Sequence, residues 1–239
     1  MASKKWKGKL CVYCGKTPAT TADHVVARQF FLLDKRDNLP KVPACAPCNS
    51  EKSGHETYLT AVLPFGGRHA DALSTLQDMV PPRLAKHAKL QATLRRGRER
   101  LWRPSEGGVL MPALAIPFDH QRMVALFQEI VRGLAWHHWA VILADGYQVE
   151  AGALSREGEA IFSTLIEARC HREVHVDLGD GAFVYDGYQG VDYPELTVWR
   201  FTVFGGIELA GDPAAPGATT TTIWGWSARK PTSHEGGCG

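Results

Sequence analysis

The chain has 239 residues, enough for one large or two small domains, and its 44% hydrophobic and 22% charged residues are ordinary for a soluble globular protein. Its start is charged and lacks an apolar segment, and its most apolar run, residues 134–144, is too short to span a bilayer. These features exclude a secreted or membrane-embedded protein, so we expect a cytoplasmic one whose cysteines stay reduced.

The charge is unevenly distributed along the chain. Residues 1–103 carry 19 Lys and Arg against 8 Asp and Glu, whereas residues 104–239 carry 8 against 17. Such a split predicts that a polyanion, such as nucleic acid, meets the first half. The alternative is that a basic and an acidic lobe attract each other within the protein.

The first unit, residues 8–57, contains two matched cysteine pairs, Cys11-x-x-Cys14 and Cys45-x-x-Cys48. Each pair brings two sulfurs to one ion, and two pairs complete the tetrahedral shell of a structural Zn²⁺. Gly15 follows the first pair, as a tight turn with positive φ requires. A buried cysteine core and a redox couple are the alternatives.

A hairpin and a helix are expected between and after the two pairs. Residues 22–26 can form a strand in which Asp23 and His24 point to opposite faces. A turn, a short strand and the second cysteine pair follow, and a helix is expected to start at Asn49. This order can bring Asp23, His24 and Asn49 together beside the zinc.

A basic connector is expected next, because residues 83–103 hold eight Lys and Arg and one acid. Leucines at roughly helical spacing predict a helix there, with the residues after it, 103–117, as a linker. The residues predicted to touch DNA phosphates are Arg95, Arg96, Arg98 and Arg100. A solvated helix that covers the acidic lobe is the alternative.

The last unit begins near Phe118 with a helix that has a buried apolar face, and a second helix follows with Ser155 as its N-cap. Strands are then predicted at residues 173–178, 181–188, 195–211 and 219–226, the third turning back at Gly205-Gly206. The predicted fold is α+β: a zinc-braced module at 1–60, a basic helical connector at 61–117, and a helix-plus-antiparallel-sheet domain at 118–239. The last domain is expected to set specificity or bind a protein partner or ligand.

The first unit resembles the HNH endonuclease family, the zinc-bearing kind of ββα-metal nuclease, over about residues 8–57. The resemblance depends on the order of an Asp-His pair and a Cys-Asn junction inside a complete cysteine frame. The matching residues are Cys11, Cys14, Gly15, Asp23, His24, Val25, Val26, Asn38, Leu39, Val42, Pro43, Cys45, Cys48, Asn49, Lys52, Ser53 and Glu56. The loop between the predicted strands departs from the simplest family pattern, because it is longer and more apolar and lacks a Gly-Gly turn.

The resemblance implies a role for each matching residue. His24 is similar to the general base that deprotonates the attacking water, and Asp23 and Asn49 are similar to the ligands of a catalytic Mg²⁺ or another divalent cation. Asn38 resembles the middle Asn that orients the loop carrying the base. The residue types suit this chemistry, since a neutral histidine accepts a proton near pH 7 and carboxylate and amide oxygens are hard ligands.

The expected function is metal-dependent hydrolysis of phosphodiester bonds in DNA, with Lys52 and His55 near the phosphates. For these two residues a solvated helix face is the alternative. A place in phage biology or anti-phage defence rests on fold-level analogy alone. Two other functions stay open: a non-catalytic zinc-ribbon module that binds nucleic acid or acts as an adaptor, and an RNA nuclease.

Overall fold

The structure, a computed structural model, describes residues 6, 8–104, 107–153, 156–167, 171–207 and 222–231. Within these residues it is a mixture of helices and antiparallel sheets, which confirms the α+β class. The predicted N-cap Ser155 and most of the chain after Gly205-Gly206, up to residue 221, lie outside the described residues.

The first unit is a two-stranded sheet followed by a helix. Strands β1 (Thr21–His24) and β2 (Lys41–Ala44) are antiparallel, and helix α1 (Ala46–Val62) follows β2 directly. The predicted hairpin and helix are therefore present, although the helix starts at Ala46 rather than at Asn49. Phe30 and Phe31, from the long loop between the strands, are fully buried, which explains why this loop is so apolar.

The middle of the chain differs most from the prediction. It forms short helices, α2 (Ala70–Ser74), α3 (Val80–Ala85) and α4 (Ala88–Arg96), and then a hairpin of β3 (Glu99–Pro104) and β4 (Leu110–Ala115). The prediction of one basic helix through Arg100 followed by a linker is wrong. Gly97 ends α4, and a β-carbon there would lie 2.7 Å from the Pro117 ring, so the chain turns into the hairpin at this point.

The last part contains α5 (His120–Trp139), capped by the side chain of Asp119, and a five-stranded antiparallel sheet in the order β5-β9-β8-β7-β6. Its strands are β5 (Tyr147–Ala153), β6 (His171–Leu178), β7 (Phe183–Gly190), β8 (Thr197–Val203) and β9 (Ile223–Arg229). The edge strand β5 was not predicted. The expected hairpin at Gly205-Gly206 is wrong as well, because β8 pairs with β7 and β9, and Ile207 bridges to Gly67.

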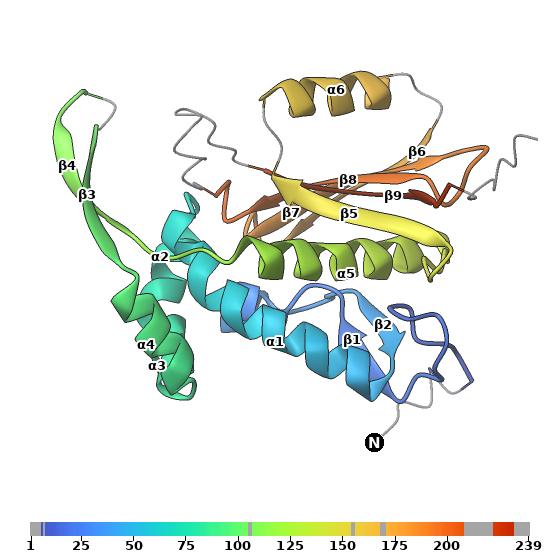
Figure 1. Cartoon of the computed structure of the whole chain (residues 1–239), viewed down its shortest axis with the longest axis horizontal. Helices are drawn as coiled ribbons and strands as arrows, with labels where there is room; N and C mark the ends of the chain where they lie inside the picture. The colour runs from blue at the N-terminus through green and yellow to red at the C-terminus, as the bar shows by residue number, and fades with distance from the viewer. Residues whose placement is uncertain are drawn as a thin grey trace, which may run out of the picture.

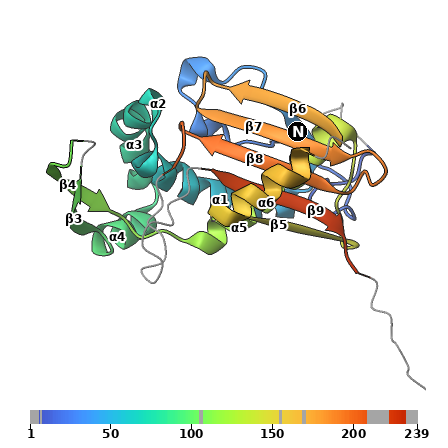
Figure 2. The same cartoon turned by 90° about the horizontal axis from the view of Figure 1, so that it is seen from above.

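Helix α5 is the centre of the molecule. Figure 1 shows the layers from the β1–β2–α1 unit through α5 to the five-stranded sheet, with α6 (Arg156–Glu167) on the far face of that sheet. The view from above shows α6 crossing the strands (Figure 2). Phe162 of α6 packs on Trp224 of β9, with ring centroids 4.9 Å apart.

Close backbone approaches join the first unit to α5. A β-carbon at Gly133 would lie 2.7 Å from the side chain of Val25, and one at Gly15 would lie 2.5 Å from Ala144. One continuous set of buried apolar residues runs from Cys11 to Ile223. The three predicted units therefore share a single core. Among the described helices, none is both long and apolar enough to cross a membrane.

Candidate functional site

The four predicted cysteines come together. The sulfurs of Cys11, Cys14, Cys45 and Cys48 all lie within 4.8 Å of one another. Gly15 adopts φ +66° and donates its N–H to the carbonyl of Cys11 at 2.8 Å, which forms the tight turn that the sequence predicted. Four reduced sulfurs at this separation could hold one structural Zn²⁺.

The electrostatics differ between the two cysteines of the first pair, because burial raises the pKa of Cys11 above its ordinary value. Partial burial opposes the charged form of Cys14, but hydrogen bonds from the backbone N–H groups of Thr17 and Lys16 outweigh it and lower its pKa to about 6. The thiolate is the form of cysteine that ligates metal.

Asp23 lies on β1 with its side chain turned towards α1 and is only 8% exposed. Its Oδ2 accepts a hydrogen bond from the Tyr13 hydroxyl at 2.5 Å and lies 2.9 Å from Nζ of Lys52. Both contacts fall on Oδ2, and among the described residues no partner contacts Oδ1. One carboxylate oxygen of Asp23 is therefore held in place and the other remains a free acceptor.

Lys52 does not lie where the sequence predicted it. It is fully buried, and its ammonium contacts Asp23, Glu56 at 2.5 Å and the carbonyl of His24 at 2.8 Å. The prediction that Lys52 contacts nucleic acid is wrong, because a buried ammonium with three oxygen partners cannot reach a phosphate at the surface. It positions β1 against α1 instead. Glu56, four residues later on α1, is its ion-pair partner.

Asn49 lies in the first turn of α1, where its N–H donates to the carbonyl of Cys45 at 3.1 Å. Its side-chain Nδ2 lies 3.3 Å from Oγ1 of Thr21, the residue two positions before Asp23 on the same face of β1. Asn49 and Asp23 are thus on the same side of the strand, and Oδ1 of Asn49 has no partner among the described residues.

His24 lies on the other face of β1, as the alternation of a strand requires. It lines a cavity of about 690 Å³ together with Asn38, Lys41, Arg36 and Trp136. Asp23 and Asn49 are not among the described residues that line this cavity. The structure therefore brings Asp23 and Asn49 to one side of β1 and His24 and Asn38 to the other, and the expected meeting of all three catalytic residues stays a prediction.

The environment of His24 keeps its imidazole neutral. Partial burial, followed by the positive charges of Lys41 and Arg28, lowers the pKa of His24 below its ordinary value of 6.5, and the negative charge of Asp23 offsets only part of this effect. A neutral imidazole can accept a proton at pH 7. Asn38, in the same cavity, adopts φ 56°, a left-handed conformation that asparagine tolerates better than most residues.

The remaining predicted contacts with nucleic acid are mostly at the surface. Arg95 and Arg96 are exposed at the end of α4, Arg98 and Arg100 are exposed at the start of the hairpin, and His55 is half-buried on α1. Arg96 and Arg100 are four residues apart, the spacing of one helix face, but they lie on different elements. Arg100 shares a face of β3 with Trp102, which is 68% exposed.

Sequence reasoning missed two members of the polar cluster around Lys52. Tyr13 falls between the first two cysteines, and Glu129 lies on α5, far away in sequence. Burial, reinforced by Glu51, Glu56 and Asp23, raises the pKa of Glu129 to about 8 although Lys52 opposes the shift, and Oε2 of Glu129 is buried without a hydrogen-bond partner. The only sequence signal for Glu129 was a single acid within the apolar pattern of its helix.

The chain matches no protein-family model, no curated protein and no solved structure. Inferences about its function therefore rest on its own residues and on the motif resemblance.

Proposed function

We propose that this protein is a metal-dependent endonuclease of the HNH kind that hydrolyses phosphodiester bonds in DNA. The observation that carries the proposal is the arrangement around β1. Asp23 and Asn49 present free Oδ1 atoms on the side facing α1, and the adjacent His24 is neutral and lines a cavity with basic residues.

The oxygen donors fit a hard divalent cation such as Mg²⁺. Asp23 and Asn49 would hold it, since one is a carboxylate and the other an amide, and each has an oxygen without a partner among the described residues. When bound, the cation would supply positive charge to the phosphate under attack. The four sulfurs, which suit Zn²⁺, would serve the fold.

In this proposal the protein's own groups handle the proton and the substrate. His24 takes the proton of the attacking water, because its lowered pKa keeps the imidazole unprotonated at pH 7. Lys9, Arg36 and Lys41 line the cavity of His24 and would attract the phosphate to it. The proposal requires the phosphate to lie at the end of β1, where it can reach both this cavity and a cation held by Asp23 and Asn49 on the other face. Lys52 and Tyr13 hold the Asp23 carboxylate in one orientation.

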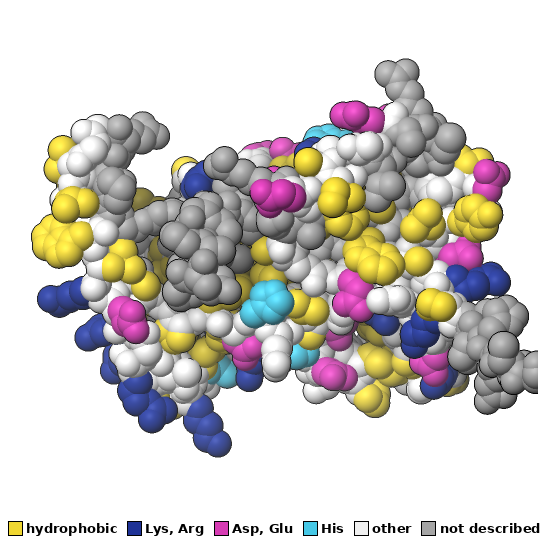
Figure 3. All heavy atoms as spheres, turned by 45° about the horizontal axis from the view of Figure 1, so that its top comes forward, with side chains coloured by type: hydrophobic (Ala, Val, Ile, Leu, Met, Phe, Trp, Pro, Cys, Tyr) yellow, Lys and Arg dark blue, Asp and Glu magenta, His cyan; other side chains and the backbone are white. Residues whose placement is uncertain are grey.

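A basic surface extends the proposed binding site for nucleic acid. Figure 3 shows Lys and Arg side chains gathered at the end of the molecule that carries α3, α4 and the β3–β4 hairpin. The exposed residues there include Arg95, Arg96, Arg98 and Arg100. Contacts with phosphate from such residues add affinity that does not depend on sequence and weakens with salt.

One observation favours the non-catalytic alternative, a zinc module that only binds nucleic acid or a partner. Asp23 already has a buried cation, Lys52, at 2.9 Å, so its carboxylate has a structural role without any metal. In that case His24 is a surface histidine in a basic cavity and the protein binds DNA without cutting it.

Incubation of supercoiled plasmid and of labelled RNA with the protein and Mg²⁺ or Mn²⁺ tests the proposal. We expect plasmid cleavage that falls on the order of 10²–10⁴-fold in His24→Ala, with DNA binding and melting temperature nearly unchanged. His175→Ala, which removes an exposed histidine on β6, should cleave like the wild type. Asn49→Ala should lower the rate and shift the metal dependence.

The pH dependence gives a second readout. The base is active when deprotonated, so the rate should be level above pH 6.5 and fall about tenfold per unit below the lowered pKa of His24. Binding without cleavage under every metal condition would establish the non-catalytic alternative. Cleavage of RNA alone would reassign the substrate, and wild-type cleavage by His24→Ala would remove the proposed base.

A further inference from the structure

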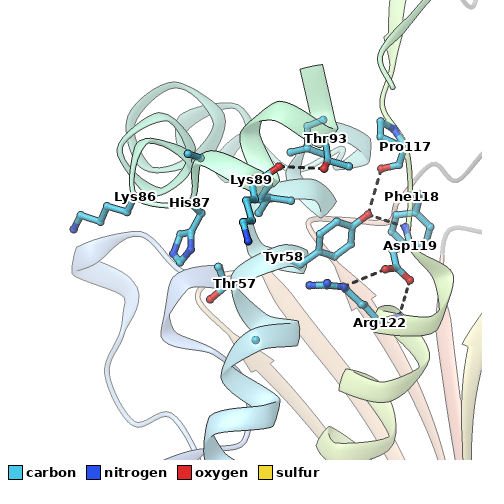
Figure 4. A pocket seen from close by; sticks show the side chains of 14 residues that line it. Thr57, Tyr58, Lys86, His87, Lys89, Thr93, Pro117, Phe118, Asp119 and Arg122 are labelled. Atoms are coloured by element: carbon cyan, nitrogen blue, oxygen red, sulfur yellow. Dashed lines mark hydrogen bonds and ion pairs between the residues drawn. The ribbon is translucent and has the colours of Figure 1, made fainter. Parts of the chain in front are cut away.

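A second cavity, of about 870 Å³, lies between the latter half of α1, the junction of α3 and α4, and the start of α5 (Figure 4). Its volume is typical of sites that bind small molecules. It is separate from the proposed catalytic site: Gly54, Thr57 and Tyr58 of α1 line it, whereas Asn49 and Lys52 face β1.

One part of the cavity wall is apolar and held in place. Leu90 and Leu94 of α4 and Phe118 before α5 contribute this part. The Tyr58 hydroxyl donates to the Pro117 carbonyl at 3.2 Å and accepts from the backbone N–H of Asp119 at 2.7 Å. Because both hydrogen bonds tie α1 to the start of α5, the part of this wall formed by Tyr58 and Phe118 is held in place before any ligand arrives.

Polar and charged side chains line the other part of the cavity. The side chains of Lys89 and His87 extend towards α1 and Thr57, and the Arg122 guanidinium lies 5.2 Å from the centre of the Tyr58 ring (Figure 4). Arg122 is paired with Asp119 at 3.1 Å, but Lys89 has no ion-pair partner among the described residues. Lys86 also lines the cavity, although its side chain points away from Tyr58 in this view.

We propose that this cavity binds a compact organic phosphate of mononucleotide size. A phosphate monoester carries between one and two negative charges near pH 7, which complements an unpaired Lys89 beside His87 and Arg122. A flat apolar group, such as a nucleobase, would cover Leu90 and Phe118. The same chemistry is offered by a free nucleotide and by the phosphorylated end of a nucleic-acid strand.

Calorimetric titration of the full zinc-loaded chain with dAMP tests the site without any cleavage reaction. We expect a dissociation constant below about 1 mM, with inorganic phosphate and 2′-deoxyadenosine each binding at least tenfold more weakly because each fills only one part of the cavity. Lys89→Ala should weaken dAMP binding at least tenfold. Arg95→Ala is the matched control, because it removes an exposed positive charge on the same helix outside the cavity lining, and it should change dAMP binding less than twofold.

A second variant blocks the cavity from α1. A β-carbon added at Gly54 meets nothing within 4 Å, so Gly54→Leu can enter the cavity without a clash and also favours the helix. It should keep the melting temperature and abolish dAMP binding, while Gly54→Ala keeps most of the binding. Absence of dAMP binding at millimolar concentration, or equal binding by Gly54→Leu and wild type, would overturn the proposal.

Two further comparisons distinguish a specific site from general charge attraction and from the nuclease itself. Equal losses in Arg95→Ala and Lys89→Ala would show general charge attraction and would also overturn the proposal. His24→Ala should bind dAMP like the wild type, so this inference can succeed or fail independently of the nuclease. Tighter binding of a 5′-phosphorylated tetranucleotide than of dAMP would identify a strand end as the source, and the reverse would identify the free nucleotide.

Discussion

On one side of α5, towards β1 and α1, the apolar core contains a cluster of buried polar groups: Tyr13, Asp23, Lys52, Glu56 and Glu129. On its other side, the space towards the sheet is filled by aromatic rings. Phe127 of α5 lies 5.1 Å from Phe201 and 6.3 Å from Phe183, measured between ring centroids. The same helix therefore contacts a region that combines apolar packing with a polar cluster on one side, and a region held by apolar packing on the other.

The difference teaches that the two sides should respond to different conditions. Charges taken out of water depend on their partners and on pH, whereas the stability of an apolar core depends on shape and volume. A small polar interior of this kind needs another source of stability, which the four sulfurs and their metal can supply.

Loss of the metal should lower stability more than any of the changes below, and the lost stability should be concentrated on the side of α5 that faces β1 and α1. Structural zinc contributes on the order of 10–16 kcal/mol in small zinc-binding peptides. We expect about one zinc per chain by elemental analysis, and in Cys45→Ser a loss of amide protection in β1 and α1 that exceeds the loss in β7 and β8. Hydrogen exchange measures both. Equal loss on the two sides would mean that the regions unfold as one unit.

Removal of the buried Lys52 ammonium should cause the next largest loss of stability. Lys52→Met leaves Asp23 and Glu56 buried without their partner, which typically costs about 3–5 kcal/mol at pH 7. The cost should shrink as the pH falls, because protonation of the carboxyls removes the uncompensated charges. Lys16→Met, which breaks an exposed pair with Asp145, is the control and should leave the free energy of unfolding nearly unchanged at every pH.

Replacement of Glu129 should raise the free energy of unfolding, whereas the replacements above lower it. Its pKa in the folded protein, about 8, lies above the ordinary value of 4.5, so folding favours its protonated form and wild-type stability decreases as the pH rises between these values. Glu129→Gln should therefore be more stable than wild type at pH 8, on the order of a few kcal/mol, and similar to it near pH 4.5. Denaturant unfolding at both pH values measures this, and a variant that is less stable at pH 8 would contradict it.

A small change in the sheet completes the comparison. Ile223→Val removes one methylene from a buried position of β9 and should cost about 0.5–1.5 kcal/mol. The loss should be the same at pH 5 and pH 8, because no titratable group is altered. A loss that varied with pH would show that the sheet and the polar cluster are coupled through α5.

Short-range patterns predicted much of the first unit. Two Cys-x-x-Cys pairs indicated the sulfur cluster, and the alternation of a strand placed Asp23 and His24 on opposite faces, both as observed. Apolar residues at helical spacing predicted α5, and β-branched and aromatic residues predicted four of the five strands of the large sheet. These patterns succeed because they depend on residues that are close together in the chain.

Contacts between distant segments decided the rest. Lys52 looked like a surface residue, and only the packing of α1 on β1 and α5 shows it to be buried between Asp23 and Glu56. Arg96 and Arg100 have helical spacing, yet Gly97 ends the helix and the pairing of β3 with β4 places Arg100 on a strand. The cavity at Lys89 likewise forms only where three helices meet. Burial and strand pairing depend on which segments meet in space, and that information is absent from any short stretch of sequence.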